Sequence, residues 1–213
     1  MMVEQILTGG DRNFAYIVAD AESHLAAVVD PSYDPARVYD RVKELGMVVR
    51  YVLNTHDHHD HSNGNDEMER LSGCPALGFG SKDPDTGMEL VDNAELPLGG
   101  KTIHIIHTPG HTEDSLCFLV GNYLFTGDTL FVGKVGGTDF GKQAETQFKS
   151  LRTKLMTLPG EVRVFPGHDV GVQPHSTIQH EKNTNPFLIR SKYEDFLDLK
   201  KNWLEYKQMH GIQ

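Results

Sequence analysis

Histidine and aspartate are concentrated in one short segment of this 213-residue chain. Residues 55–61 read Thr-His-Asp-His-His-Asp-His and hold four of the twelve histidines. Imidazole suits zinc and iron as a ligand, and carboxylate adds a harder, charged donor. Side chains two residues apart on an extended strand point the same way, so His56 and His58 can reach one point. Asp60 and His61 then turn toward a second point, and the pattern predicts two neighbouring metal ions.

Three later segments repeat one layout, in which a predicted strand ends in a turn that carries a metal-ligand type. They are residues 108–112 (Thr-Pro-Gly-His-Thr), 126–129 (Thr-Gly-Asp-Thr) and 166–169 (Pro-Gly-His-Asp). Each alone is typical of an ordinary turn or helix cap. Metal sites are assembled from loops at the ends of rigid strands, and here four strand ends each present a ligand type.

Short strands and two well-marked helices must position these turns. We expect strands at residues 3–8, 13–19, 24–29, 47–53, 101–107, 116–120, 123–126 and 162–165. Asp34 and Pro35 predict the start of a helix that Gly46 ends. A second helix is predicted over 143–158, where Phe148, Leu151 and Leu155 follow helical spacing.

The C-terminal part is predicted to be helical and to pack on the rest of the chain. Ser191 and Glu194 form a candidate capping box. The predicted helix places four apolar side chains on one stripe: Phe196, Leu197, Trp203 and Leu204. We therefore expect a single α/β domain over residues 1–213, with a short helical extension over about 176–213.

Composition limits the class of partner. There are 20 Lys plus Arg against 30 Asp plus Glu, a net charge of −10 that opposes binding to nucleic acid. Two cysteines cannot form a disulfide framework, which favours a reducing compartment. We find no export signal and no apolar stretch of membrane-spanning length. The sequence therefore predicts a cytoplasmic protein with a small-molecule substrate and no nucleic-acid or membrane partner.

The order of the motifs resembles the signature of the metallo-β-lactamase superfamily, T-H-x-H-x-D-H followed by separate His, Asp and His motifs. The resemblance covers about residues 13–168. It implies an αββα sandwich, in which two mixed β-sheets are flanked by helices and the metals lie in a cleft at one edge. Carried over by position, it assigns His56, His58 and His111 to one metal, Asp60, His61 and His168 to the other, and Asp128 to both.

Within that superfamily the chain is similar to hydroxyacylglutathione hydrolases (glyoxalase II), through residues 108–112, 127–131 and the Leu-Pro-Gly at 158–160. It differs from them at Asp169 and Val170, where Glu and Tyr are usual, and in its short tail. The resemblance implies that a hydroxide shared by two divalent metals attacks a thioester or related ester, with Asp60 as the catalytic residue that orients it. Zinc is the expected metal, and iron and manganese accept the same ligands.

A second branch of the superfamily offers an oxidative alternative. Persulfide dioxygenases share the first motif, a Thr-Asp-Phe segment, found here at 138–140, and a late His-Asp pair. The resemblance implies one iron on His56, His111 and Asp128 in that case. Gly137 and Val170 replace the usual arginine and tyrosine of that branch.

Lactone hydrolysis and a non-catalytic metal-binding scaffold also stay open. Specificity in this fold comes from loops over the cleft. We expect those loops at residues 81–100 and 132–142.

Overall fold

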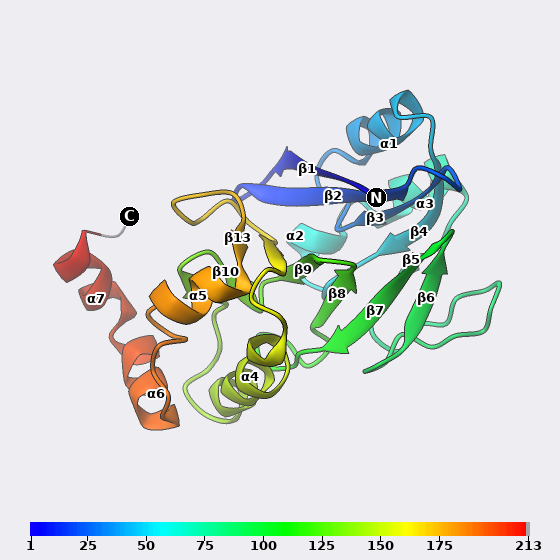
Figure 1. The fold of residues 1–213 in the computed structure, drawn as a ribbon. Coiled ribbons are helices and arrows are strands. Elements are labelled where there is room, and N and C mark those ends of the chain that lie inside the picture. Colours follow the sequence, from blue (N-terminus) through cyan, green and yellow to red (C-terminus); the bar gives the residue numbers. More distant parts are fainter. Residues whose placement is uncertain (212–213) are drawn as a thin grey trace.

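Two β-sheets lie face to face, with helices against both outer surfaces (Figure 1). The computed structural model describes residues 1–211. Its elements are β1 Met2–Gly9, β2 Asn13–Asp20, β3 Leu25–Val29, α1 Pro35–Glu44, β4 Val48–Leu53, α2 His59–Ser62, α3 Asn65–Ser72, β5 Ala76–Leu77, β6 Glu95–Leu98, β7 Lys101–His107, β8 Leu116–Val120, β9 Tyr123–Gly127, β10 Leu130–Phe131, β11 Lys134–Val135, α4 Lys142–Thr153, a 3-10 turn Leu155–Thr157, β12 Arg163–Pro166, β13 Ser176–Thr177, α5 Ile178–Thr184, α6 Tyr193–Lys201 and α7 Trp203–His210.

Both sheets are mixed. The first has the order β1-β2-β3-β4-β5, with antiparallel pairs up to β3 and parallel pairs from β3 to β5. The second has the order β13-β12-β9-β8-β7-β6, and its one parallel pair is β12 with β9. The predicted αββα sandwich of two mixed sheets is therefore confirmed.

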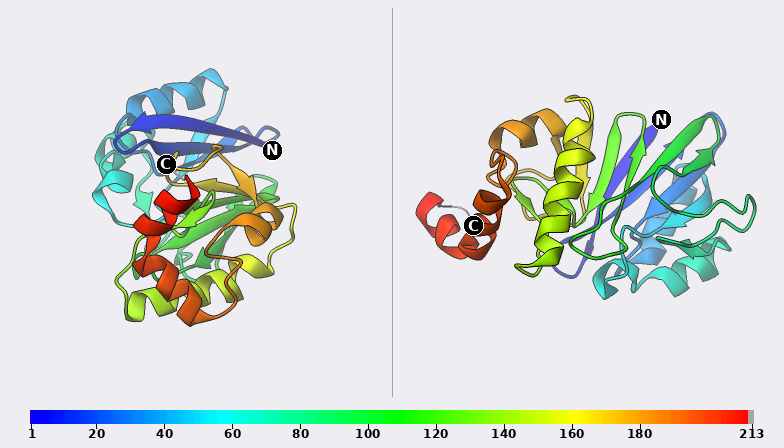
Figure 2. Two further views of the ribbon diagram at one scale, coloured as in Figure 1. Left: turned by 90° about the vertical axis from the view of Figure 1, so that its left-hand side faces the viewer. Right: turned by 90° about the horizontal axis from the view of Figure 1, so that it is seen from below.

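Alternation along the strands divides the apolar side chains into three layers. Between the sheets lie large buried residues such as Tyr16, Tyr51 and Phe118. On the outer face of the first sheet, Val38 of α1 and Met68 of α3 pack against the strands. The left view of Figure 2 shows the N-terminal sheet in blue and cyan above the green and yellow second sheet.

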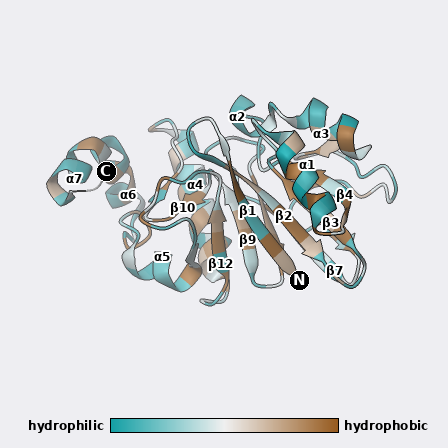
Figure 3. Ribbon diagram, turned by 90° about the horizontal axis from the view of Figure 1, so that it is seen from above, coloured by the Kyte–Doolittle hydropathy of each residue, from teal (hydrophilic) through white to brown (hydrophobic). Residues whose placement is uncertain are grey.

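The outer face of the second sheet is covered by α4, α5 and α6. Cys117 on this face and its neighbour Phe118 on the inner face show the two-residue period of β8. Phe196 of α6 is fully buried there. Apolar residues concentrate in the strands, whereas α1 and α3 turn hydrophilic residues outward (Figure 3).

Several local predictions are confirmed at their marked residues. Asp34 is the N-cap of α1 and its Oδ1 accepts the Arg37 backbone N–H at 3.2 Å. Gly46 follows the helix with a φ of 71°, a conformation that glycine adopts without strain. The ranges 101–107 and 116–120 match β7 and β8.

The predicted C-terminal helix is wrong in detail. The N-cap of α6 is Lys192 and makes no side-chain capping bond, so Ser191 does not form the capping box. The helix α6 ends at Asn202, and α7 begins directly after it. Leu204 is 67% exposed, so the predicted stripe does not continue into α7. The single domain with its extension stays a prediction, and residues 212 and 213 lie outside the described part.

The second predicted helix is shorter than expected, because α4 ends at Thr153 and a 3-10 turn follows. No helix among residues 1–211 is long and apolar enough to cross a membrane. The location of the protein in the cell stays a prediction.

The apolar side chains between the two sheets should contribute most to the free energy of unfolding. We expect Phe118→Ala to lower the free energy of unfolding by about 3–5 kcal/mol, because the side chain is fully buried between the sheets. Phe140→Ala is the matched control, since Phe140 is 55% exposed and should change stability by no more than about 0.5 kcal/mol. Urea unfolding measures both, and equal losses would contradict this description of the core.

Candidate metal centre

The turns predicted to bind metal meet at one edge of the sandwich. β9 and β12 are parallel neighbours, so the turn at Asp128 lies beside the turn at His168. The backbone N–H of Gly167 donates to the Gly127 carbonyl at 2.8 Å. Across the sandwich, the Leu116 N–H donates to the Thr55 carbonyl at 2.7 Å and ties the two sheets together at this edge.

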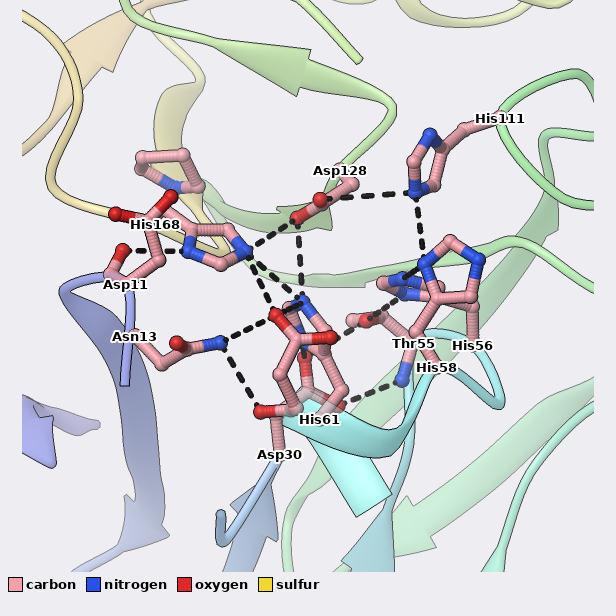
Figure 4. Close-up of polar contacts among 12 residues, drawn as sticks. Asp11, Asn13, Asp30, Thr55, His56, His58, His61, His111, Asp128 and His168 are labelled. Carbon is pink, nitrogen blue, oxygen red and sulfur yellow. Dashed lines mark hydrogen bonds and ion pairs between the residues drawn. The ribbon is translucent and has the colours of Figure 1, made fainter. Parts of the chain in front are cut away.

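Three histidines form one half of the centre (Figure 4). His58 Nδ1 lies 3.0 Å from His56 Nε2 and 3.1 Å from His111 Nε2. His56 is buried, His111 is half-buried and His58 is exposed, so this half opens to solvent at His58. Sequence reasoning assigned the same three residues to the first metal.

Asp60, His61 and His168 form the other half. His61 Nε2 lies 3.2 Å from His168 Nε2, and Asp60 Oδ2 lies 3.4 Å from His168 Nε2. These are the residues that sequence reasoning assigned to the second metal.

Asp128 lies between the two halves (Figure 4). Its Oδ1 is 3.3 Å from His61 Nε2 and its Oδ2 is 3.6 Å from His111 Nε2. One carboxylate oxygen therefore faces each half. The structure brings all seven predicted residues together, and their role as metal ligands stays a prediction.

The donor atoms fit a pair of metal ions. Within each set His56–His58–His111 and Asp60–His61–His168, one donor atom per residue lies within 4.8 Å of the others. Ring nitrogens 3.0–3.2 Å apart cannot all donate to one another, because a neutral imidazole has one N–H. Asp128 Oδ1 is buried without a hydrogen bond of normal geometry. Such a set of unshared electron pairs is satisfied by cations.

Comparison with known proteins agrees with the fold and the site. The model of the metallo-beta-lactamase superfamily matches residues 8–168, which include all seven side chains. The chain belongs to the metallo-β-lactamase superfamily.

Relatives in this superfamily have more than one activity. A probable polyketide biosynthesis zinc-dependent hydrolase, BaeB of Bacillus velezensis, is 31% identical over 88% of this chain and 87% of its own. The mitochondrial persulfide dioxygenase ETHE1 of Homo sapiens is 30% identical over 95% of this chain and 81% of its own. The hydroxyacylglutathione hydrolase of Rhodospirillum rubrum is 34% identical over 82% of this chain and 68% of its own.

Among solved structures, ETHE1 from Myxococcus xanthus superimposes with a TM-score of 0.86. It is 29% identical, and the match covers 95% of this chain and 91% of that one. These similarities support a metal-dependent hydrolase or oxidoreductase, and they do not distinguish the two.

The short helix α2 carries two of the three residues of the second half of the centre. His58 is extended, with φ −56° and ψ 138°, and is the N-cap of α2. Asp60 and His61 lie on α2 itself, a helical turn that the sequence did not predict. The Asn54 side chain donates to the His61 carbonyl at 3.0 Å and anchors the end of the turn.

Asp30 supports the centre from below and was missed in the sequence. It follows the buried strand β3, its Oδ1 accepts the Thr55 backbone N–H at 2.8 Å, and its Oδ2 accepts the Thr55 hydroxyl at 2.7 Å. His61 Nδ1 lies 3.0 Å from Asp30 Oδ2 and donates to it, which turns Nε2 toward Asp128. The available signal was a charged residue directly after the apolar run Ala27-Val28-Val29.

The hairpin between β1 and β2 contributes two more contacts. The Asn13 side chain donates to Asp60 Oδ2 at 3.0 Å, and His168 Nδ1 donates to the Asp11 carbonyl at 2.9 Å (Figure 4). The sequence does not mark Asp11, because its contact uses a backbone carbonyl that any residue has, and Asn13 lies outside the four ligand motifs.

The two expected specificity loops differ in position. In the segment 132–142, the Gly137 carbonyl accepts a hydrogen bond from His111 Nδ1 at 2.7 Å. In the segment 81–100, Asp83 pairs with Arg50, and the Gly100 N–H donates to Asp20 at the far end of β2. The loop 132–142 therefore contacts the centre. A role in specificity stays a prediction for both loops.

Charges in the metal-free centre are divided unevenly. Burial lowers the pKa of His56 to about 3, and burial also lowers the pKa of His111. Burial acts the same way on His61, but the Asp30 charge, the hydrogen bond to Asp30 and the close Asp128 carboxylate raise its pKa to about 10. The close approach of His168 and His61 holds the pKa of Asp128 well below its ordinary value despite burial.

Asp30 should control metal affinity without touching the metal. We expect Asp30→Asn to weaken zinc binding about 10- to 100-fold, because a carboxylate partner orients the histidine and raises its basicity. Asp20→Asn is the matched control, since Asp20 is also buried and hydrogen-bonded, to Ser23 and Gly100, at the other end of β2. Competitive zinc titration measures both, and equal affinities would contradict the role of Asp30.

Zinc binding should release a proton from His61. With a pKa of about 10, metal-free His61 is protonated at pH 8, and metal can bind its ring nitrogen only after that proton leaves. The raised pKa also means that the proton stabilises the metal-free fold below about pH 6.5 and that this stabilisation is lost as pH rises through 10.

Calorimetry at pH 8 in two buffers of different ionisation enthalpy counts the protons released. We expect His61→Ala to release about one proton fewer than the unmodified protein. An unchanged count would show that His61 is neutral before metal arrives.

Proposed function

We propose that this protein is a two-metal hydrolase that cleaves a small-molecule thioester or related ester. The observation that carries the proposal is the presence of two complete donor sets with Asp128 between them. Divalent metals bound there would acidify a water molecule and polarise the acyl oxygen. Zinc is the metal we expect, and iron and manganese also match the donors.

Asp60 is the catalytic residue that we assign to the attacking water. Asn13 holds its Oδ2, and this hydrogen bond with the nearby His61 and His168 keeps the pKa of Asp60 below its ordinary value although burial opposes it. Its side chain is 35% exposed, on the open side of the centre. An ionised, accessible carboxylate can accept a hydrogen bond from water and so direct a lone pair at the substrate carbonyl.

A thioester suits this centre because its leaving group needs little help. A thiolate is a stable anion near neutral pH, so its departure does not demand a proton donor. Among residues 1–211, no cysteine is placed at the centre to compete as a sulfur nucleophile. Cys117 is fully buried, and burial raises the pKa of its thiol to about 11.

The substrate is expected at the histidine centre and not in the groove between β1 and α1. That groove encloses about 650 Å³ and is lined by charged residues that include Glu4 and Arg41. These two side chains already pair with each other at 2.7 Å. None of the seven residues of the histidine centre lines this groove.

A persulfide dioxygenase is the second candidate. It is favoured by the similarity to the Myxococcus xanthus structure over 95% of this chain. In that case one iron would be held by His56, His111 and Asp128, a two-histidine, one-carboxylate set suited to non-haem iron.

Metal content and substrate turnover separate the two candidates. We expect protein purified without added metal to contain two divalent ions per chain and the zinc form to hydrolyse an acyl thioester. His58→Ala and Asp128→Asn should each lower kcat/KM about 100-fold or more, because each removes a donor from the centre. His104→Ala is the matched control, since His104 is exposed and pairs with Glu95 away from the centre.

One iron per chain, with oxygen uptake on a glutathione persulfide and no thioester hydrolysis, would reject the hydrolase and support the dioxygenase. Unchanged turnover in both centre variants would show that the seven residues are misassigned.

A further inference from the structure

Lys200 of α6 reaches from the C-terminal helices to the loop that holds His111. Its Nζ donates to the Gly136 carbonyl at 2.7 Å. Lys200 lies beyond residue 168, where the superfamily match ends. The contact therefore joins the C-terminal helices to the metal centre through a segment that the family signature does not contain.

Burial of the Lys200 ammonium group costs free energy, because it removes the charge from water. The group lies 5.5 Å from the ring centre of Phe196 and 5.9 Å from that of Phe187. Within residues 1–211 no carboxylate lies within 4.0 Å of Lys200 Nζ. Burial lowers the pKa of Lys200 to about 8. The carbonyl of Gly136 is thus the main polar partner of a largely desolvated charge.

The carbonyl that Lys200 holds belongs to a segment that needs external support. Gly136 and Gly137 are consecutive glycines, which have more backbone freedom than any other pair. The close packing requires glycine at 136, since a Cβ there would lie 1.9 Å from the Asp128 carbonyl oxygen and 3.1 Å from His111 Nδ1. A second donor, Gln147 Nε2 on α4, also reaches the Gly136 carbonyl at 3.1 Å.

The next carbonyl along this segment determines the state of His111. The Gly137 oxygen accepts the hydrogen bond from His111 Nδ1 at 2.7 Å. When Nδ1 carries the proton, Nε2 keeps its lone pair, and Nε2 is the atom that lies 3.1 Å from His58 and 3.6 Å from Asp128. The position of the Gly137 carbonyl, in the peptide that follows the one held by Lys200, therefore decides which nitrogen faces the centre.

We propose that Lys200, with Gln147, is a positioning residue. By holding the Gly136 carbonyl it fixes the backbone that enters Gly137, so that the Gly137 carbonyl accepts from His111 Nδ1 and His111 presents Nε2 to the metal centre. The inference rests on the proposed metal-dependent function. It adds that the C-terminal helices set the affinity of the half of the centre that contains His111.

Zinc titration of metal-free variants tests the proposal. We expect Lys200→Met to weaken zinc binding about 10-fold, toward the loss caused by His111→Ala, because it keeps an apolar stem and removes the donor. Lys201→Met is the control, since Lys201 is the next residue of α6 and is exposed. Gln147→Leu, which removes the other donor, should weaken the same half of the centre.

A double-mutant cycle separates positioning from simple stability. If Lys200 acts through His111, Lys200→Met should cost little further zinc affinity when His111→Ala is already present. Nitrogen-15 NMR of the metal-free protein should also show His111 protonated at Nδ1 in the unmodified chain and a mixture of tautomers in Lys200→Met. A helix that merely docks would change the unfolding free energy and leave both readouts unaltered.

Two results would overturn the proposal. One is a Lys200→Met zinc curve that coincides with that of Lys201→Met, and the other is a full additional loss on the His111→Ala background. Failure of the unmodified protein to bind zinc, iron or manganese would instead reject the proposed function.

Discussion

Ring nitrogens and carboxylate oxygens with unshared electron pairs converge at one edge of this sandwich, and the surrounding strands and turns hold them close together. His58 Nδ1 lies within 3.1 Å of two other ring nitrogens, and Asp128 Oδ1 is buried without a well-formed hydrogen bond. Such groups cost free energy until a cation satisfies them. A flexible chain would relax them apart, so they must be carried by turns that cannot move far. The ends of paired strands meet that demand, because each turn is tied to its neighbour by backbone hydrogen bonds such as that from Gly167 to Gly127.

The supports behind the centre come from all parts of the chain. Asp30 orients His61 from the end of β3, the β1–β2 hairpin holds Asp60 and His168, and the Gly137 carbonyl orients His111. The imidazoles of His61, His168 and His111 are thereby each directed through Nδ1, the nitrogen that does not face the centre. Burial lowers the pKa of His56, whereas the contact with Asp30 raises the pKa of His61. For His61, protonation and orientation therefore result from one contact.

Much of the architecture could be predicted because short-range signals agreed with the final fold. The two-residue alternation of β7 and β8 and the capped start of α1 are local features, and the structure retains them. The helices α2 and α3 were not predicted, since α2 is a single polar turn and carries no apolar period. The C-terminal stripe failed at Leu204 because helical periodicity does not reveal a break at Asn202. Two-residue strands such as β10 and β13 exist only through their partners.

The sequence by itself predicted the seven side chains that meet at the centre, and the family resemblance divided them into two sets, because ligand type and order along the chain are encoded in single residues. Only the tertiary structure decided how those side chains are held. Asp30, Asn13 and the carbonyls of Asp11 and Gly137 act through position, and Lys200 approaches Gly136 from 64 residues away. The type of a residue does not show whether its backbone carbonyl accepts a hydrogen bond from the centre, since every residue has such a carbonyl.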